Sequence, residues 1–288
     1  MSDFKLLING QLVDGDSTMD VINPATEQPV AQCARASKGQ LDQAVAAAKA
    51  AFPAWAAMPV AERSAILLKV AEGVEARIEE LAQVETRDNG SLLRSHRRGV
   101  MPRVAMNIRF FAEYAVKELS HPDFDTRGHR NHVSWDPAGV TAIVTPWNAP
   151  LMLATWRIGP ALAAGNTVVA KPPEWAPLTA SLFADIAHEA GLPAGVFHYL
   201  SGSGREIGEA LVEKLTGEEA LDELLEAERA KDELRDIMSR LISAEIRYTQ
   251  MGYWMRRAPY ISCALLVLLA GFMAWQGWVG LHGHGHES

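Results

Sequence analysis

The chain has 288 residues and a formal net charge of −8, with 48% hydrophobic and 22% charged residues, which is an ordinary globular balance. This charge argues against a nucleic-acid partner, because phosphate binding needs a basic face and the basic residues are scattered. Cys33 and Cys263 are the only cysteines, which excludes a disulfide framework or a thiolate metal cluster. The N-terminus lacks the regions of a secretory signal, so we expect the globular part to be cytoplasmic.

The first part of the chain predicts antiparallel strands followed by helices. Residues 4–13 alternate about an Asn-Gly turn and predict a β-hairpin, and residues 20–31 continue as strands and a turn. From residue 37 to residue 89, apolar residues recur every three or four positions, which predicts helices with a break at Pro53. We interpret these apolar positions as an ordinary buried helix face. A further helix is expected over residues 101–119.

Short strands and helices then alternate along the chain. The predicted strands cover residues 132–135, 140–144, 167–170 and 196–200, and the predicted helices cover residues 151–164 and 178–190 and begin again near residue 204. Strand and helix alternating at this spacing indicate a parallel sheet with crossover helices. The sequence therefore predicts an α/β fold.

The composition changes near Thr216. Thr216 and Glu219 form a capping-box pattern, which predicts a charge-dense amphipathic helix within residues 214–258. Because residues 226–233 interrupt the apolar spacing, a solvated stalk and a coiled coil both remain open.

An uncharged apolar run near the end of the chain predicts a membrane helix. Residues 260–281 contain no Asp, Glu, Lys or Arg, and a helix of that length spans about 33 Å, which matches a hydrocarbon core of about 30 Å. We therefore expect one transmembrane helix over residues 259–281. Arg256 and Arg257 precede the run and no basic residue follows it, so the positive-inside rule predicts a single-pass protein with a cytoplasmic N-terminal domain and a short C-terminal tail outside.

The tail at residues 282–288 carries His282, His284 and His286 at alternating positions. Imidazoles at this spacing can bind Cu(II), Ni(II) or Zn(II), but flexible ligands separated by glycine make a weak and unselective site. An unstructured polar end is the alternative. We assign no metal site here and keep the three histidines as weak candidates.

Three motifs, TPWN, KPPE and GLPAGV, occur in this order within residues 141–197. This stretch resembles the aldehyde dehydrogenase superfamily. With SHRRGVMPRVAMNIRFFAEY at residues 95–114 and NHVSWDPAG at residues 131–139, the chain looks most like the 5-carboxymethyl-2-hydroxymuconate semialdehyde dehydrogenases. The resemblance implies a truncated aldehyde dehydrogenase-like, NAD-binding domain over residues 1–213, before the amphipathic helix and the membrane helix.

The resemblance also implies roles for individual residues. Asn148 would donate its amide to the oxygen that gains negative charge when a nucleophile attacks an aldehyde. Lys171 and Glu174 follow a predicted strand, at the edge where a parallel sheet binds its ligand, and would hold the adenosine ribose of NAD. Trp147 is expected beside the nicotinamide. Gly204 lies in GSGREIG, a turn expected near the dinucleotide but weak as a motif because its spacing is not G-x-G-x-x-G.

The catalytic groups of the family cannot be placed. The reaction needs a cysteine nucleophile and a glutamate base, and the E-L-G-G-K and G-Q-x-C contexts of these residues do not occur after residue 213. Cys33 lies on a predicted N-terminal strand, and we do not expect it to be catalytic. Arg97, Arg98 and Arg103 could bind a carboxylated substrate by bidentate contacts, although solvated helix charges are the commoner role.

Three hypotheses follow from these features. The chain is a membrane-anchored aldehyde dehydrogenase-family protein that lacks the full catalytic machinery and binds NAD weakly. Alternatively, it is a scaffold or assembly subunit of a membrane complex, with a partner chain, membrane lipid or further copies of itself as partners. The third hypothesis is a fusion whose functional part is the membrane tail.

Overall fold

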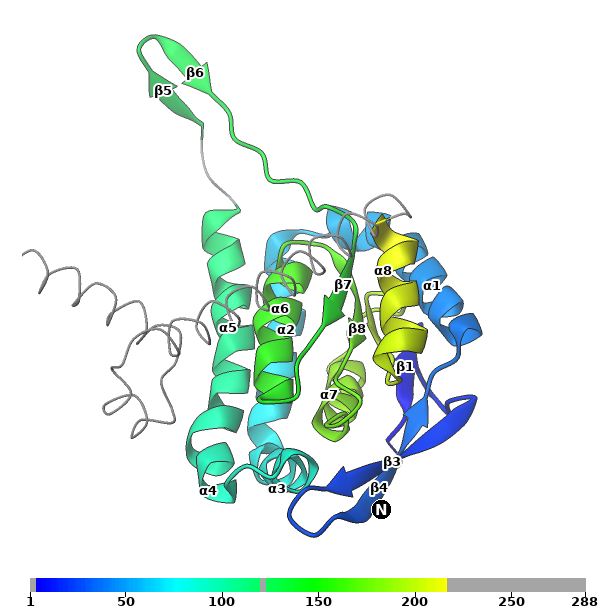
Figure 1. Cartoon of the computed structure of the whole chain (residues 1–288). Helices are drawn as coiled ribbons and strands as arrows, with labels where there is room; N and C mark the ends of the chain where they lie inside the picture. The colour runs from blue at the N-terminus through cyan, green and yellow to red at the C-terminus, as the bar shows by residue number, and fades with distance from the viewer. Residues whose placement is uncertain (1–3, 120–122, 217–288) are drawn as a thin grey trace, which may run out of the picture. The chain divides into compact units, whose positions relative to one another are not determined.

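A mixed five-stranded sheet forms the centre of the protein, in the order β2-β1-β9-β8-β7 (Figure 1). β7 (Val140–Val144), β8 (Thr167–Lys171) and β9 (Phe197–Tyr199) are parallel to one another, which confirms three of the predicted strands. β1 (Leu6–Ile8) pairs antiparallel with both β9 and β2 (Gln11–Val13). The predicted N-terminal hairpin is therefore an edge element of this sheet and makes it mixed.

This computed structural model describes residues 4–119 and 123–216. Residues 1–221 form one compact unit, and the second unit, Asp222–Ser288, lies outside the described residues. The membrane helix predicted at residues 259–281, the histidine tail and the predicted stalk from residue 217 onward also lie outside them. Within the described part, no single helix is long and apolar enough to cross a membrane. Only the pair formed by the first two helices reaches the required length and composition, and that pair bends by 119°.

Helices cover both faces of the sheet. α6 (Pro150–Ala163) and α7 (Leu178–Glu189) connect the parallel strands and pack against one face. α1 (Lys38–Ala57) and α8 (Glu209–Thr216) pack against the other face. Successive side chains of a strand point to opposite faces, so the run TVVAK in β8, buried along its whole length, contributes to both apolar layers.

The prediction of a helix break at Pro53 is wrong. Ser37 caps the start of α1 and forms a capping box with Gln40, and the helix continues through Pro53 to Ala57. Trp55 holds this last part of the helix in the core, because it is 1% exposed and its indole N–H donates to Leu162 O at 3.2 Å. This burial offsets the backbone hydrogen bond that proline removes.

A helical layer lies beyond α6 and α7. It contains α2 (Val60–Ala76), α3 (Ile78–Asn89), the short α4 (Leu93–Ser95), the π-helical turn η1 (His96–Val100) and α5 (Met101–Glu118). α5 packs against both α2 and α6, and its bounds confirm the helix predicted over residues 101–119.

Two further hairpins lie outside the central sheet. β3 (Ser17–Asn23) pairs with β4 (Gln28–Arg35), as the pattern at residues 20–31 predicts. β5 (Phe124–Thr126) and β6 (His129–Asn131) form a hairpin that projects from the body (Figure 1). The prediction of a strand at residues 132–135 is wrong. The hairpin turns at Arg127 and Gly128, which both have positive φ, so its paired strands fall within residues 124–131.

Candidate functional site

The loops that follow the three parallel strands meet at one edge of the sheet. Val144, the last residue of β7, lies opposite Lys171, the last residue of β8. Thr145 N then donates to Lys171 O at 3.3 Å, which ties the two loops together. This edge is where open parallel sheets bind their ligands.

The hydrogen bonds of Glu174 show that the loops after β8 and β9 lie in contact. Glu174 Oε2 accepts a hydrogen bond from Gly204 N at 3.2 Å, and Glu174 Oε1 accepts one from Trp175 Nε1 at 3.1 Å. Glu174 is exposed, and the space beside Gly204 is open because a Cβ there would meet nothing within 4 Å. The carboxylate is therefore held in place while its remaining lone pairs face solvent.

Lys171 is the buried member of the site. Its side chain is 4% exposed, and Nζ donates to Pro172 O at 2.7 Å. Burial lowers the pKa of this ammonium group, and the nearby Glu174 carboxylate partly opposes that shift. A Cβ added at Gly208 would lie 3.5 Å from Lys171 Cδ, so the turn carrying Gly208 covers the lysine stem. Lys171 and Glu174 thus offer a donor and an acceptor side by side.

The turn after β9 is a π-helical segment, η2 (Gly204–Gly208). The hydroxyl of Ser203 caps it by accepting from Glu206 N at 3.2 Å. Arg35 Nε donates to Glu206 Oε2 at 3.2 Å, and this hydrogen bond lowers the pKa of Glu206. The Arg35–Glu206 pair fixes η2 to β4. The sequence carries no local signal for it, because the two residues are 171 positions apart.

Asn148 and Trp147 lie in the β7–α6 loop. Both are exposed, Trp147 to 63%. Among the described residues, neither takes part in the hydrogen bonds that link Lys171, Glu174 and Gly204 to the protein. The exposed side-chain amide of Asn148 can donate to a ligand in this loop.

Cys33 has the properties of a structural thiol. It is fully buried in β4, and its Sγ lies 3.5 Å from Ser201 Oγ and 3.9 Å from Tyr199 Oη. Burial raises the pKa of the thiol to about 11, whereas a nucleophile needs a lowered pKa. The structure supports the expectation that Cys33 is not catalytic.

The three candidate arginines differ in their surroundings. Arg97 is paired, because its Nε donates to Glu79 Oε2 at 2.7 Å. Arg98 and Arg103 are exposed on η1 and α5. Arg103 lies on a helix that packs against α6, the helix that follows the Asn148 loop.

The sequence did not predict a buried pair of carboxyl groups on α3. Glu85 and Asp88 of α3 are 0% and 1% exposed and bind the start of α7: Thr179 Oγ1 donates to Glu85 Oε2 at 2.7 Å, and Leu178 N donates to Asp88 Oδ2 at 2.9 Å. Burial raises the pKa of Glu85 to about 7 and that of Asp88 well above its usual value. His96, 2% exposed, lies with Nδ1 at 3.8 Å from Glu85 Oε1.

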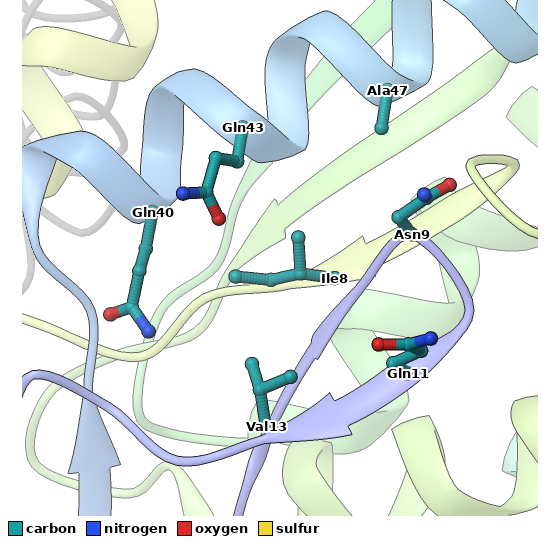
Figure 2. Close-up of a pocket in the computed structure, with 7 residues that line it drawn as sticks. All are labelled: Ile8, Asn9, Gln11, Val13, Gln40, Gln43 and Ala47. Carbon is teal, nitrogen blue, oxygen red and sulfur yellow. The ribbon is translucent and has the colours of Figure 1, made fainter.

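A cavity of about 320 Å³ lies beside η2, lined in part by Arg35, Glu206 and Ile207. Two others lie away from the strand ends that carry the candidate site. One of about 370 Å³ lies between α1 and the β1–β2 hairpin, where Figure 2 shows the amide side chains of Gln40, Gln43, Asn9 and Gln11 around it. Another of about 990 Å³ lies beside α3 and β4. Within the described part of the chain, no three His, Cys, Asp or Glu side chains are grouped as metal ligands. His282, His284 and His286 lie outside the described residues.

The chain is similar in sequence to known proteins over most of its described part. The model of the aldehyde dehydrogenase family matches residues 12–218. The chain belongs to the aldehyde dehydrogenase family. It is 39% identical over 207 residues to 5-carboxymethyl-2-hydroxymuconate semialdehyde dehydrogenase of Escherichia coli, covering 71% of this chain and 44% of that protein. It is 38% identical over 206 residues to 2-aminomuconic semialdehyde dehydrogenase of Mus musculus, covering 71% and 42%.

Solved structures of the family agree with this assignment. A putative aldehyde dehydrogenase from Burkholderia cenocepacia is 42% identical with a TM-score of 0.69, covering 73% of this chain and 43% of that one. PnpE in complex with nicotinamide adenine dinucleotide is 41% identical with the same TM-score, covering 74% and 44%. The chain thus spans less than half the length of each of these four relatives.

Proposed function

We propose that this chain is a membrane-anchored member of the semialdehyde dehydrogenase branch that binds NAD weakly and does not complete aldehyde oxidation by itself. The observation that carries the proposal is the cluster of Lys171, Glu174 and Gly204 at the carboxyl ends of β8 and β9. A related protein, PnpE, is known in complex with nicotinamide adenine dinucleotide.

The residues present fit one part of the dinucleotide. A ribose diol needs both a donor and an acceptor, and Lys171 Nζ and the Glu174 carboxylate supply one each. The open space beside Gly204 leaves room for the ligand backbone. NAD accepts a hydride from the substrate when it is bound. Asn148 would donate to the substrate oxygen, and Trp147 would cover the nicotinamide side.

We expect weak binding because the residues of the site are exposed to solvent. Small-molecule sites bury most of their ligand in a cleft, whereas Glu174, Gly204, Trp147 and Asn148 are all exposed. A large part of the dinucleotide would remain in solvent. We therefore expect a dissociation constant in the millimolar range, on the order of 1 mM.

The absence of turnover rests on the cysteines of the sequence. Cys33 and Cys263 are the only two, and Cys33 is buried with a raised pKa. Cys263 lies within the uncharged run proposed to cross the membrane. Neither can attack an aldehyde bound near Asn148. We expect no NADH formation from 5-carboxymethyl-2-hydroxymuconate semialdehyde or simple aldehydes. Turnover that is lost in Cys33→Ala would contradict the assignment of that cysteine as structural.

The membrane location is proposed from sequence. The run at residues 260–281 is long enough to cross a bilayer, and Arg256 and Arg257 favour a cytoplasmic N-terminal domain with the tail outside. The full chain should then resist alkaline carbonate extraction, while a variant ending at Arg257 should be released. Protease added to intact spheroplasts should reach only the tail. A full chain that is soluble without detergent would contradict the anchor.

A scaffold role in a membrane complex is the second candidate. It is favoured by large apolar side chains that stay exposed, among them Trp147 at 63%, Trp156 at 45% and Trp175 at 76%. Exposed aromatic residues of this size commonly mark protein contacts. A partner chain that copurifies with the protein and is lost on Trp156→Ser would support this role over NAD binding. The third hypothesis, a fusion whose functional part is the membrane tail, would gain support if the tail alone complements loss of the chain.

A further inference from the structure

The start of α7 is buried and has no side-chain cap from its own N-cap residue. The N–H groups in the first turn of a helix find no acceptor within that helix. The N-cap residue of α7 is Pro177, whose side chain accepts no hydrogen bond. Leu178 and Thr179, the first two residues of α7, are 2% and 0% exposed, so this turn is shielded from solvent. Its donors therefore need acceptors from another element.

α3 supplies these acceptors. Asp88 Oδ2 accepts a hydrogen bond from Leu178 N at 2.9 Å, and the backbone N–H of Thr179 bonds to the same carboxyl. A protonated carboxyl keeps an acceptor oxygen, so this contact persists although burial raises the pKa of Asp88. Asp88 thus acts as the N-cap of a helix whose first residue lies 90 positions further along the chain.

The loop that leads into α7 carries Glu174. This loop, residues 172–177, begins at β8, which is held between β7 and β9 in the sheet. At the other end, Pro177 O accepts from the buried hydroxyl of Tyr199 at 2.9 Å, and Asp88 holds the residue that follows. A short loop with both ends fixed has few conformations. The position of Glu174 therefore depends on the position of the start of α7.

We propose that Asp88 is a positioning residue for Glu174, because by capping α7 it holds the loop in which the Glu174 carboxylate meets Gly204 N. This role rests on the proposed dinucleotide site, since it acts on the carboxylate assigned to the ribose. The bond from Gly204 N to Glu174 Oε2 is 3.2 Å long, at the upper limit of the usual range, so a small displacement of the loop breaks it. Asp88 is 1% exposed and acts through the loop, not by contact with a ligand.

A second buried hydrogen bond at the same helix start provides a matched control. Thr179 Oγ1 donates to Glu85 Oε2 at 2.7 Å. Thr179→Val removes this bond and keeps the shape of the side chain, while Leu178 N keeps its acceptor on Asp88. The control shows whether any lost hydrogen bond at the start of α7 has the same effect as loss of the cap.

Amide hydrogen exchange of the full chain in non-ionic detergent reports the position of Glu174 without a ligand, because the Gly204 N–H bonds to this carboxylate. In Asp88→Ala, the Gly204 amide should exchange about threefold faster than in the parent. Asp88→Asn keeps an acceptor oxygen and should exchange as the parent does, and so should Thr179→Val. If Asp88→Ala does not fold, Asp88→Ser carries the same prediction, because its oxygen is one bond too short to reach Leu178 N.

Binding of NAD by the same variants, followed by ligand-observed NMR, tests whether Asp88 acts through Glu174. Asp88→Ala should raise the dissociation constant by about threefold, while Asp88→Asn and Thr179→Val should leave it unchanged. A positioning residue acts only through the group that it positions. Asp88→Ala combined with Glu174→Gln should therefore bind NAD as Glu174→Gln alone does, whereas a merely structural role would make the two losses multiply.

Four results would each overturn this role of Asp88. They are unchanged exchange of the Gly204 amide in folded Asp88→Ala, equal effects of Thr179→Val and Asp88→Ala, failure of Asp88→Asn to behave as the parent, and losses of NAD affinity that multiply in the double variant. A parent that does not bind NAD would instead contradict the proposed function. The exchange of the Gly204 amide would then decide the role of Asp88 by itself.

Discussion

Glu85→Gln should change how the stability of the protein depends on pH. Glu85 is fully buried, and its pKa rises from 4.5 in the unfolded chain to about 7 in the fold. Between these values the folded carboxyl keeps a proton that the unfolded one releases, so the folded state binds more protons. The free energy of unfolding of the parent therefore falls as pH rises through this window, and the contribution is constant above about pH 7.

The size of this change in stability follows from the pKa shift of Glu85. A change of one pKa unit corresponds to about 1.4 kcal/mol, so Glu85 should remove about 3 kcal/mol between pH 4.5 and pH 7. Glutamine is of similar size, keeps an oxygen for the bond from Thr179 and does not titrate. The stability of Glu85→Gln relative to the parent should therefore rise by about 3 kcal/mol across this range.

Urea denaturation of the full chain in non-ionic detergent, followed by far-ultraviolet circular dichroism, measures this difference. Asp88 is also buried with a raised pKa, mainly because of its burial and in smaller part because of the Glu85 charge. The difference between the two proteins therefore reports on Glu85 together with its effect on Asp88. The exposed Glu62→Gln controls for the loss of one negative charge. A stability difference that stays constant between pH 4.5 and pH 7 would show that Glu85 does not titrate with a raised pKa in the folded protein.

Two further predictions concern a thiol and a glycine. In a Cys263→Ser background, Cys33 should resist iodoacetamide at pH 8 until the chain is unfolded, because it is fully buried with a pKa of about 11; labelling of the native protein within minutes would contradict this. Gly195→Ala should lower the free energy of unfolding more than Gly191→Ala by about 1–3 kcal/mol. Both glycines have φ near +80°, but only at Gly195 would a Cβ lie 2.8 Å from Ala47 O. Equal losses in denaturation would show that contact to be unimportant.

The sheet and its crossover helices could be predicted because their signals are local. The runs at β7 and β8 are rich in β-branched residues and are separated by a helical pattern, so their type and order follow from periodicity. The failures are also local in origin. Pro53 predicts a helix break, but the helix continues because Trp55 is buried in the core. A strand was expected at residues 132–135, but the turn at Arg127 places the hairpin earlier in the chain.

The candidate site was predicted only in part. Lys171, Glu174 and Gly204 came from motif resemblance, whereas the hydrogen bond between Glu174 and Gly204 depends on how β8 and β9 are paired. The ion pair of Arg35 with Glu206 joins residues with no common motif. Such contacts arise from tertiary packing, and no spacing in a single sequence encodes them.

The buried acidic cluster was missed for a different reason. Glu85 and Asp88 lie on α3 among other charged residues, so the sequence reads as a solvated helix face. Their burial depends on the start of α7, because groups there donate hydrogen bonds to both carboxyls. A helix terminus from a distant segment is thus what makes the two charged positions tolerable in the core.

Calorimetric titration of the full chain with NAD tests whether Lys171 and Glu174 hold the dinucleotide. We expect a dissociation constant on the order of 1 mM that rises by about tenfold in both Lys171→Ala and Glu174→Gln, because each variant removes one side of the pair that would hold the ribose. Arg98→Gln, an exposed change outside this cluster, should bind as the parent does. Equal binding by the parent and by both Lys171→Ala and Glu174→Gln would show that these two residues do not hold NAD.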